Sequence, residues 1–297
     1  MAHVELDAAA VVLSRRSARE RWFPALQLAP VAAFLAIFFV VPLGIFLVYS
    51  FWITRRYELV ADWTVANYSE ALHEPAYRRL LWNTLLVAAM ASACTLAVAY
   101  PFAYAIHFRL RRHREPLLFL VLLALFSGYL VKIYAWKTIL GNRGIINEAL
   151  LRLGLIDDPL SFLLYSRPAA VVTFVNFLVP LAVLPIYASL QNVADEQVEA
   201  ARDLGARGLA AFRRITLPLT RDGLLVAFAF TFIIAAGDYV TPQLVGGTSG
   251  AMIGKAVVST FGVTFNWPLG SALAFLTLVA VVLVLVGARK LVIRTLR

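Results

Sequence analysis

The sequence has almost no cysteine and little charge. Cys94 is the single cysteine among 297 residues, so a disulfide within the chain is impossible and a metal cluster held by cysteines is excluded. Only 15% of the residues are charged while 61% are hydrophobic, which is not the balance of a soluble domain. The four histidines, His3, His73, His107 and His113, lack the spacing of metal ligands. We therefore expect neither a metal site nor a cofactor bound by this chain.

Long apolar runs predict an all-α polytopic membrane protein. Six segments are long and apolar enough to cross a bilayer as helices, at about 26–52, 80–106, 117–139, 168–190, 222–245 and 269–288. The first is longer than the core of a signal peptide, and it has no obvious small-residue cleavage site. We therefore expect a retained first helix. We see no sequence repeat or low-complexity linker, which favours one membrane domain.

Basic residues flank the apolar runs and set the predicted orientation. The net charge is +10, and with a cytoplasmic N-terminus 17 of the 27 Lys and Arg residues fall on the cytoplasmic side, as the positive-inside rule expects. They are Arg15, Arg16, Arg19, Arg21, Arg109, Arg111, Arg112, Arg114, Arg202, Arg207, Arg213, Arg214, Arg221, Arg289, Lys290, Arg294 and Arg297. We therefore expect a multi-pass protein of the cell inner membrane with both termini cytoplasmic. Its surroundings are membrane lipid, and no nucleic acid is expected as a partner.

A polar insert at residues 192–218 must lie outside the bilayer. Asn192 is a plausible N-cap of a first helix, with Asp195 and Glu196 near its positive end, and Gly205 follows where a left-handed C-cap would end it. Apolar residues recur at helical spacing, as Val198, Ala201 and Leu204 in this helix and as Leu209, Phe212 and Ile215 in a second one. Two short amphipathic helices need a partner surface to bury Val198, Leu204 and Phe212. The insert is therefore predicted to be a docking element.

Seven residues of this insert resemble the EAA loop of permease subunits in binding-protein-dependent ABC importers. The matching residues are Glu199, Ala200, Ala201, Gly205, Ile215, Leu217 and Pro218. The resemblance implies that the insert docks into a groove of the ATPase subunit and transmits its closure to the pore. It also implies that Glu199 faces a basic residue of the ATPase and that Gly205 permits the turn between the helices. Asp203 would cap the helix locally or reach the ATPase.

Two segments faintly match enzyme motifs. Residues 247–250 read GTSG, as in intramembrane serine proteases, but those need a later histidine and all four histidines precede Ser249. Lys255 follows a glycine as in a phosphate-binding loop, but Ser249 stands where the first glycine is required and no strand precedes it. We therefore expect no catalytic residue, and ATP hydrolysis must come from another chain. A membrane hydrolase acting through Ser249 is kept as an alternative.

Asp238 is the leading candidate for the transport path. A carboxylate inside an apolar span costs about 2.5–3.5 kcal/mol on insertion scales, so such a residue is a functional candidate by default. It lies 15 residues after Gly223, which is roughly 22 Å along a helix. On that helix Thr231, Asp238 and Thr241 share one face. Such a stripe could line a pore.

Lys132 lies at nearly the same predicted depth and leaves the role of Asp238 open. The two residues could form an ion pair, or Asp238 could line the pore while Lys132 snorkels to the outer interface. Aromatic residues at this level are either an interfacial belt or, with Asp238, a site for an organic cation; they are Tyr129, Tyr134, Trp136 and Tyr239. Asn176, beside Pro180 and Pro185, is a weaker lining candidate.

Two further stretches, at 127–156 and 237–271, resemble spermidine/putrescine importer permeases, particularly the first of their two paired permeases. The similarity covers about residues 63–289 and implies the type I ABC importer fold. We divide the chain accordingly into a cytoplasmic tail at 1–25, a first helix with an outer loop at 26–78, the transmembrane domain at 79–289 and a cytoplasmic tail at 290–297.

The resemblance also implies partners and a cargo. The partners would be a second homologous permease, an ATP-binding cassette ATPase dimer that uses ATP and Mg, and an extracytoplasmic solute-binding protein. The cargo would be a polyamine such as spermidine or putrescine. Related permeases carry opines, other amines, aminophosphonates or metal-loaded anions, so the substrate stays open here. An autonomous ion-coupled transporter is a different class, and the absence of an obvious inverted repeat weighs against it.

Overall fold

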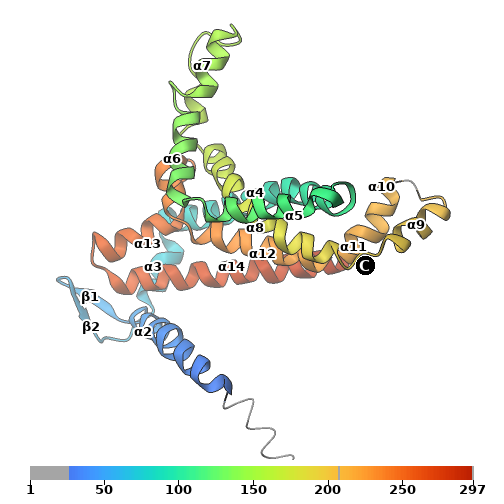
Figure 1. Cartoon of the computed structure of the whole chain (residues 1–297). Helices are drawn as coiled ribbons and strands as arrows, with labels where there is room; N and C mark the ends of the chain where they lie inside the picture. The colour runs from blue at the N-terminus through green and yellow to red at the C-terminus, as the bar shows by residue number, and fades with distance from the viewer. Residues whose placement is uncertain (1–26, 207, 296–297) are drawn as a thin grey trace, which may run out of the picture.

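A computed structural model describes residues 27–206 and 208–295 as an almost entirely helical chain (Figure 1). The predicted tail at 1–25, Arg207 and Arg297 lie outside the described residues, as does the side chain of Arg202. In the first part, the helical segment Gln27–Tyr49 contains η1 (Ala36–Val40) and α2 (Val41–Tyr49). A hairpin of β1 (Ile53–Arg55) and β2 (Glu58–Val60) follows it.

The remaining elements are helical. They are α3 (Ala66–His73), α4 (Pro75–Tyr104), η2 (Ala105–Arg109), η3 (Arg111–His113), α5 (Arg114–Phe126), α6 (Tyr129–Leu140), α7 (Ile145–Arg152), η4 (Ser161–Leu163) and α8 (Arg167–Leu190). After these come α9 (Asp195–Asp203), α10 (Gly208–Ala211), η5 (Phe212–Thr216), α11 (Leu217–Leu219), α12 (Arg221–Gly237), η6 (Pro242–Gly246), α13 (Ile253–Gly262) and α14 (Trp267–Thr295).

Within the described part of the chain, four helical segments are long and apolar enough to cross a membrane: Gln27–Tyr49, Pro75–Arg109, Arg167–Leu190 and Trp267–Thr295. Two pairs of helices pass the same test only together. Arg111–Phe126 and Tyr129–Arg152 meet at 88°, and Gly208–Leu219 and Arg221–Gly237 meet at 68°. Counting each bent pair as one span gives the six spans that the sequence predicts.

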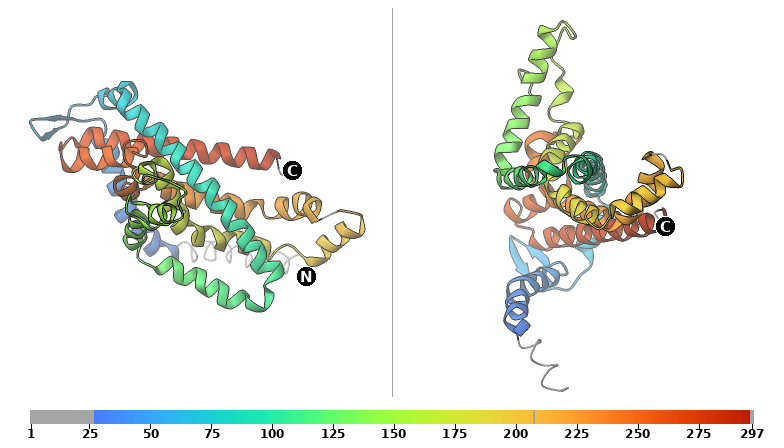
Figure 2. Two further views of the ribbon diagram at one scale, coloured as in Figure 1. Left: turned by 90° about the horizontal axis from the view of Figure 1, so that it is seen from above. Right: turned by 45° about the vertical axis from the view of Figure 1, so that its right-hand side comes forward.

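The predicted span at 117–139 is wrong as a single helix because α5 ends at Phe126 and α6 leaves at a right angle (Figures 1 and 2). The carbonyl of Ala124, in the last turn of α5, accepts hydrogen bonds from Ser127 Oγ at 2.9 Å and from Lys132 Nζ at 2.7 Å. A cation near the C-terminus of a helix also interacts favourably with the negative end of the helix dipole. Lys132 therefore stabilises the turn between the two helices.

The predicted span at 222–245 is likewise interrupted, because α12 ends at Gly237 and the backbone of Asp238 is extended. Pro242 explains the break. In a continuous helix its ring would clash with the carbonyl of Asp238, four residues earlier, and it has no N–H to donate. The shared face predicted for Thr231, Asp238 and Thr241 therefore does not exist.

Small residues line the helix contacts at the centre of the bundle, where α4 packs along α8 and α12. Ala88, Ala91, Ala99 and Ala103 of α4 are completely buried. Small side chains let helix backbones approach closely, which is the usual way that membrane helices associate. Phe174 of α8 and Phe232 of α12 fill the remaining space and are also fully buried.

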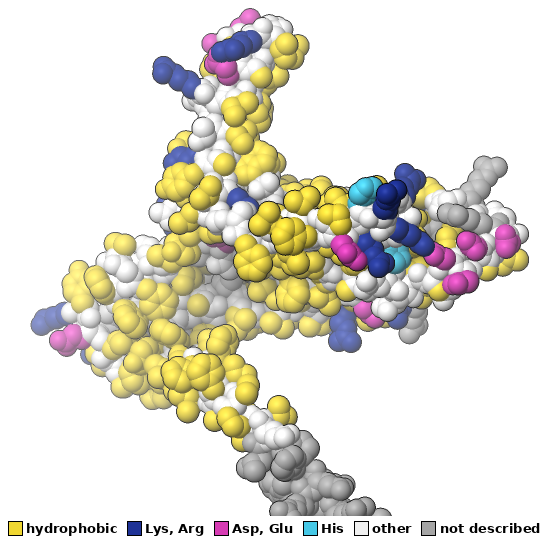
Figure 3. Space-filling view, viewed as in Figure 1, with side chains coloured by type: hydrophobic (Ala, Val, Ile, Leu, Met, Phe, Trp, Pro, Cys, Tyr) yellow, Lys and Arg dark blue, Asp and Glu magenta, His cyan; other side chains and the backbone are white. Residues whose placement is uncertain are grey.

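Charged and apolar side chains are separated along the molecule. Figure 3 shows a face on which apolar side chains cover the middle, while Lys, Arg, Asp and Glu gather at the two ends and at the tip of α7. The helices α9 and α10 form one end, and the hairpin, α3 and α13 lie at the opposite end (Figures 1 and 2). This separation is that of a protein whose middle is surrounded by lipid.

The turn between η6 and α13 is fastened to α4. Asn83 Nδ2 donates to the carbonyls of Ser249 at 3.0 Å and Ala251 at 2.6 Å. Thr84 Oγ1 accepts the N–H of Ile253 at 2.8 Å. These bonds hold the chain after the α12 break against the N-terminal part of α4, the longest described helix.

Gly247→Ala should lower the stability of this turn. Gly247 has φ +58°, and a Cβ there would lie 2.1 Å from the carbonyl oxygen of Tyr165. Such a conformation costs an L-residue about 1–3 kcal/mol before the clash is counted. We expect a lower thermal unfolding midpoint in detergent. Gly262→Ala is the matched control, because nothing lies within 4 Å of its added Cβ. Equal midpoints for the two variants would refute the steric explanation.

Candidate coupling loop and transport path

The first helix of the polar insert, α9, begins later than predicted. It starts at Asp195, with Asp195 and Glu196 in its first turn, where the positive end of the helix dipole favours acidic side chains. Asn192 is not its N-cap. The backbone N–H of Asn192 instead donates to the carbonyl of Ser189 at 3.2 Å, in the turn that closes α8.

The end of α9 is the one predicted. Gly205 has φ +86°, and the N–H of Ala206 donates to the carbonyl of Ala201 at 2.9 Å, which is the bond of a Schellman C-cap. The predicted glycine stop is confirmed. After the turn, Gly208–Leu219 forms the second helix of the insert.

Of the three apolar residues predicted to need a partner surface, two are covered by this chain itself. Val198 is buried within this chain, and Phe212 packs edge-on against Tyr100, with ring centroids 5.5 Å apart. Neither needs a partner. Leu204 is 89% exposed, as predicted, and Leu209 is 71% exposed. The apolar surface left for a partner therefore consists of Leu204 and Leu209, one on each side of the Gly205 turn.

The seven motif residues and Asp203 divide into an exposed set and a buried or half-buried set. Glu199, Ala200, Asp203 and Gly205 are exposed on and after α9. Ala201 is buried, and Ile215, Leu217 and Pro218 are half-buried. A concavity of about 580 Å³ beside them is lined by Leu209, Ala210, Arg213 and Arg214. Glu199 and Asp203 therefore remain free to meet a partner, whereas the Ile-x-Leu-Pro part anchors the insert.

Two contacts join the insert to the bundle. Beside the Phe212 contact, the hydroxyls of Tyr100 on α4 and Thr220 lie 2.7 Å apart, with both residues buried. On the other side, Arg111 donates to both carboxylate oxygens of Asp195, at 2.6 and 2.8 Å. That hydrogen bond lowers the pKa of Asp195. The pair is therefore intact at neutral pH and is lost only in acid, as the pH falls from about 4 through the lowered pKa.

Asp195→Arg should weaken coupling between the insert and any ATPase, because it places two cations where α9 meets the turn before α5. We expect a severalfold drop in ATP-driven uptake with normal amounts of the chain in the membrane. The charge-swapped pair Arg111→Asp with Asp195→Arg should restore uptake. Failure of the swap to restore it would show that Asp195 acts by some means other than this ion pair.

The carboxylate of Asp238 accepts hydrogen bonds from four neighbouring donors. Its Oδ1 accepts the N–H groups of Val240 at 2.7 Å and Thr241 at 3.3 Å. Its Oδ2 accepts the hydroxyls of Thr241 at 2.5 Å and of Tyr129. Four donors thus saturate the carboxylate, which caps the turn after α12 and ties it to α6. Tyr129, which the sequence marked only as one aromatic among several, is the partner that sequence reasoning missed.

The predicted ion pair between Lys132 and Asp238 is absent from the described residues. Lys132 donates to the carbonyl of Ala124 instead. The two residues lie at one depth only if both spans are straight helices. The 88° bend after Phe126 shows that this condition is not met.

The other predicted lining residues are scattered. Thr231 is fully buried and donates to the carbonyls of Ala227 and Phe228 in its own helix. Tyr134 is exposed, with Lys137 Nζ 6.0 Å from its ring centroid. Tyr239 is exposed beside the Asp238 turn.

Trp136 and Asn176 are brought together in one groove. The groove has a volume of about 500 Å³ and lies where α4, α6 and α8 meet. Its walls are Cys94 and Val98 of α4, Trp136 of α6, and Val171, Val172, Val175, Asn176, Val179 and Pro180 of α8. Two of the predicted path residues, one from α6 and one from α8, therefore share one cavity.

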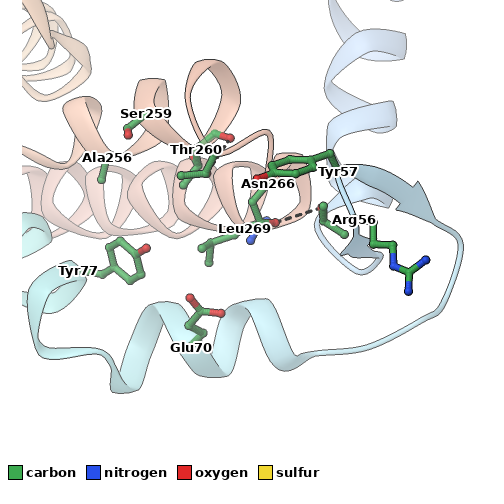
Figure 4. Close-up of a pocket in the computed structure, with 11 residues that line it drawn as sticks. Arg56, Tyr57, Glu70, Tyr77, Ala256, Ser259, Thr260, Asn266 and Leu269 are labelled. Atoms are coloured by element: carbon green, nitrogen blue, oxygen red, sulfur yellow. Dashed lines mark hydrogen bonds between the residues drawn. The ribbon is translucent and has the colours of Figure 1, made fainter.

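A second cavity, of about 550 Å³, lies among the hairpin, α3 and α13, at the end opposite the polar insert (Figure 1), and Figure 4 shows its lining. Tyr77 and Glu70 line one side of it, and Ser259 and Thr260 line another, while the guanidinium of Arg56 turns away. Thr54 Oγ1 donates to Asn266 Oδ1 at 3.3 Å at its edge. No sequence pattern predicts this cavity, because hydroxyl and amide residues are common in loops.

Ser249, the residue of the protease-like motif, has a structural contact. Its Oγ accepts the backbone N–H of Arg167 at 3.1 Å, and none of the described histidines bonds to it. The turn that contains it is the one fastened by Asn83.

An apolar bundle with charged ends, crossed several times by the chain and carrying a polar helix pair at one end, defines a multi-pass membrane protein with a docking element. Known proteins make the class specific. The profile described as "Binding-protein-dependent transport system inner membrane component" matches residues 115–297. This chain belongs to that family and is an ABC importer permease.

Curated relatives agree with the family. The chain is 34% identical over 227 residues to the spermidine/putrescine transport system permease protein PotB of Haemophilus influenzae, covering 76% of this chain and 79% of the relative. It is also 34% identical over 224 residues to PotB of Escherichia coli, covering 75% and 81%.

A solved structure confirms the fold. A bacterial ABC transporter involved in the import of the acidic polysaccharide alginate superposes with a TM-score of 0.74 at 16% identity, covering 94% of this chain and 98% of that one. The predicted all-α fold of a type I importer permease is therefore confirmed.

Proposed function

We propose that this chain is one of two permease subunits that form the membrane path of an ATP-driven polyamine importer, with spermidine or putrescine as the cargo. The observation that carries the transport mechanism is the helix pair α9–α10, which exposes Leu204 and Leu209 beside Glu199 and Asp203. The cargo is supported by the relatives named for spermidine and putrescine at 34% identity.

The partners follow from this role. An ATP-binding cassette ATPase dimer, which uses ATP and Mg, would seat Leu204 and Leu209 in a groove, with Glu199 facing a basic residue. In this proposal the insert and both termini would lie in the cytoplasm. A second homologous permease would complete the path and cover Gln27–Tyr49, none of whose most apolar stretch is buried in this chain. An extracytoplasmic binding protein would deliver the cargo at the end that carries the hairpin, α3 and α13.

The carboxylate of Asp238 does not serve as the cation site in this proposal. Four donors already occupy its lone pairs, and a substrate amine would have to displace Tyr129 or Thr241 to reach it. We assign Asp238 to holding α6 against the end of α12. Recognition of the amine then depends on the binding protein and on less strongly bonded groups in the membrane.

The test is ATP-dependent uptake by vesicles that contain this chain with its second permease, ATPase and binding protein. Labelled putrescine and spermidine are compared with an opine and an aminophosphonate. Saturable polyamine uptake that is lost without the ATPase supports the proposal. ATP-dependent uptake of another compound would keep the permease mechanism and discard the cargo, and uptake without any ATPase would overturn the mechanism.

A further inference from the structure

The groove between α4, α6 and α8 contains polar groups that lack partners at membrane depth. Asn176 lies 9 residues into α8 and 14 residues before its end, roughly 14 Å and 21 Å along the helix. Its side chain is exposed and has no hydrogen-bond partner in the described part of the chain. An amide at this depth that faced only hydrocarbon would be costly, so a polar occupant is favoured.

Pro180 leaves a second acceptor, the main-chain carbonyl of Asn176, without its usual donor. In a regular helix the N–H of residue 180 would donate to the carbonyl of Asn176, but proline has no N–H. Residues four apart share one face of a helix, and Asn176 and Pro180 both line the groove. The main-chain carbonyl and the side-chain oxygen of Asn176 are therefore two acceptors on the groove side of α8.

The remaining walls fit a hydrocarbon chain that carries a cation. Five valines supply apolar surface, Trp136 supplies an aromatic face that attracts cations, and none of the nine lining residues is charged. An ammonium group has three donors and no acceptor, which matches a pair of oxygens without a competing donor from Lys or Arg. The absence of a carboxylate among these nine residues keeps binding weak, as a transport path requires.

We propose that this groove holds an alkylammonium end of the substrate during its passage, with Asn176 as the positioning residue for the ammonium and the valines in contact with the methylene chain. This inference rests on the proposed function, because it deepens the polyamine assignment by naming the part of the path that senses the cation.

The single cysteine of the chain makes a direct test possible. Cys94 lines the same groove and is exposed. In the assembled importer in vesicles, Cys94 would be labelled with the cationic reagent aminoethyl methanethiosulfonate, and its modification would be followed by mass spectrometry of the Cys94 peptide. We expect labelling to proceed, and saturating putrescine or spermidine to slow it at least fivefold. A neutral diol of equal length should not protect.

Two variants report on the acceptors. Asn176→Leu removes the amide, and Pro180→Ala restores an N–H that occupies the Asn176 carbonyl. Each should reduce protection by polyamine and raise the KM for uptake about tenfold. Asn142→Leu makes the same polar-to-apolar change at an exposed position outside the groove and should do neither.

The outcomes separate this inference from the proposed function. Polyamine uptake with no protection of Cys94, and with unchanged KM in both variants, would overturn the groove assignment and keep the function. Labelling only by a lipid-soluble maleimide would show that lipid fills the groove. Labelling of the isolated chain but not of the complex would show that the second permease covers it. Both of these results also overturn the assignment, whereas a lack of polyamine uptake would overturn the proposed function itself.

Discussion

Leu204→Glu is expected to abolish ATP-driven uptake while the chain still inserts and folds. Leu204 is 89% exposed, so the change costs little in this chain. In the docked state the new carboxylate would be buried in the groove of the ATPase, and burying an unpaired charge costs far more than the few kcal/mol of an uncharged polar group. We expect more than a tenfold loss of uptake and less ATPase retained when the permease is purified. Leu209→Glu should act in the same way.

The matched control for this pair is Leu155→Glu. Leu155 is 67% exposed and lies after α7, away from the coupling loop, so the same substitution there should leave uptake near normal. Normal uptake in Leu204→Glu would refute the docking surface defined by Leu204 and Leu209. Equal losses in Leu155→Glu and Leu204→Glu would instead point to a general failure of insertion.

Asp238→Ala is expected to lower the free energy of unfolding by about 2–5 kcal/mol. The change leaves four donors without their acceptor, namely two backbone N–H groups and the hydroxyls of Tyr129 and Thr241. Each buried donor left unsatisfied costs about 1–3 kcal/mol, and some will find water. The measurement is the unfolding midpoint of the purified chain in detergent.

Double-mutant cycles distinguish the two partners considered for Asp238. Tyr129→Phe and Asp238→Ala share a hydrogen bond, so their effects should be non-additive by about 0.5–3 kcal/mol. Lys132→Met and Asp238→Ala should be additive within about 0.5 kcal/mol, because Lys132 bonds to Ala124. Recovery of the Asp238→Ala variant by Lys132→Met would restore the ion-pair hypothesis.

The features that depend on local pattern could be predicted from the sequence. Hydropathy located the apolar segments, although two of them are bent pairs of helices, and the glycine rule located the stop after α9 at Gly205. The motif residues between Glu199 and Pro218, which match a known loop, also indicate the family. These features can be predicted because each depends on a short stretch of sequence with a definite period or spacing.

The positions of side chains around a break could not be predicted. Ser127 and Gly128 interrupt a stretch that stays apolar on both sides, so hydropathy alone does not reveal the bend. The depth assigned to Asp238 assumed an unbroken helix, although Pro242 four residues later was a sign against one. The hairpin could not be predicted either. Arg56 and Tyr57 adopt positive φ at its turn, without the glycine or asparagine that usually marks such a turn.

The length of α4 has a mechanical consequence. Near its C-terminus, Tyr100 bonds to Thr220 and packs on Phe212 of the polar insert. Near its N-terminus, Asn83 and Thr84 hold the turn that precedes α13. Residues 83–100 contain neither glycine nor proline, so about 26 Å of unbroken helix separates the two attachments. A displacement of the insert along this axis would therefore be transmitted by one continuous helix to the opposite end of the molecule, where the hairpin, α3 and α13 lie (Figure 1).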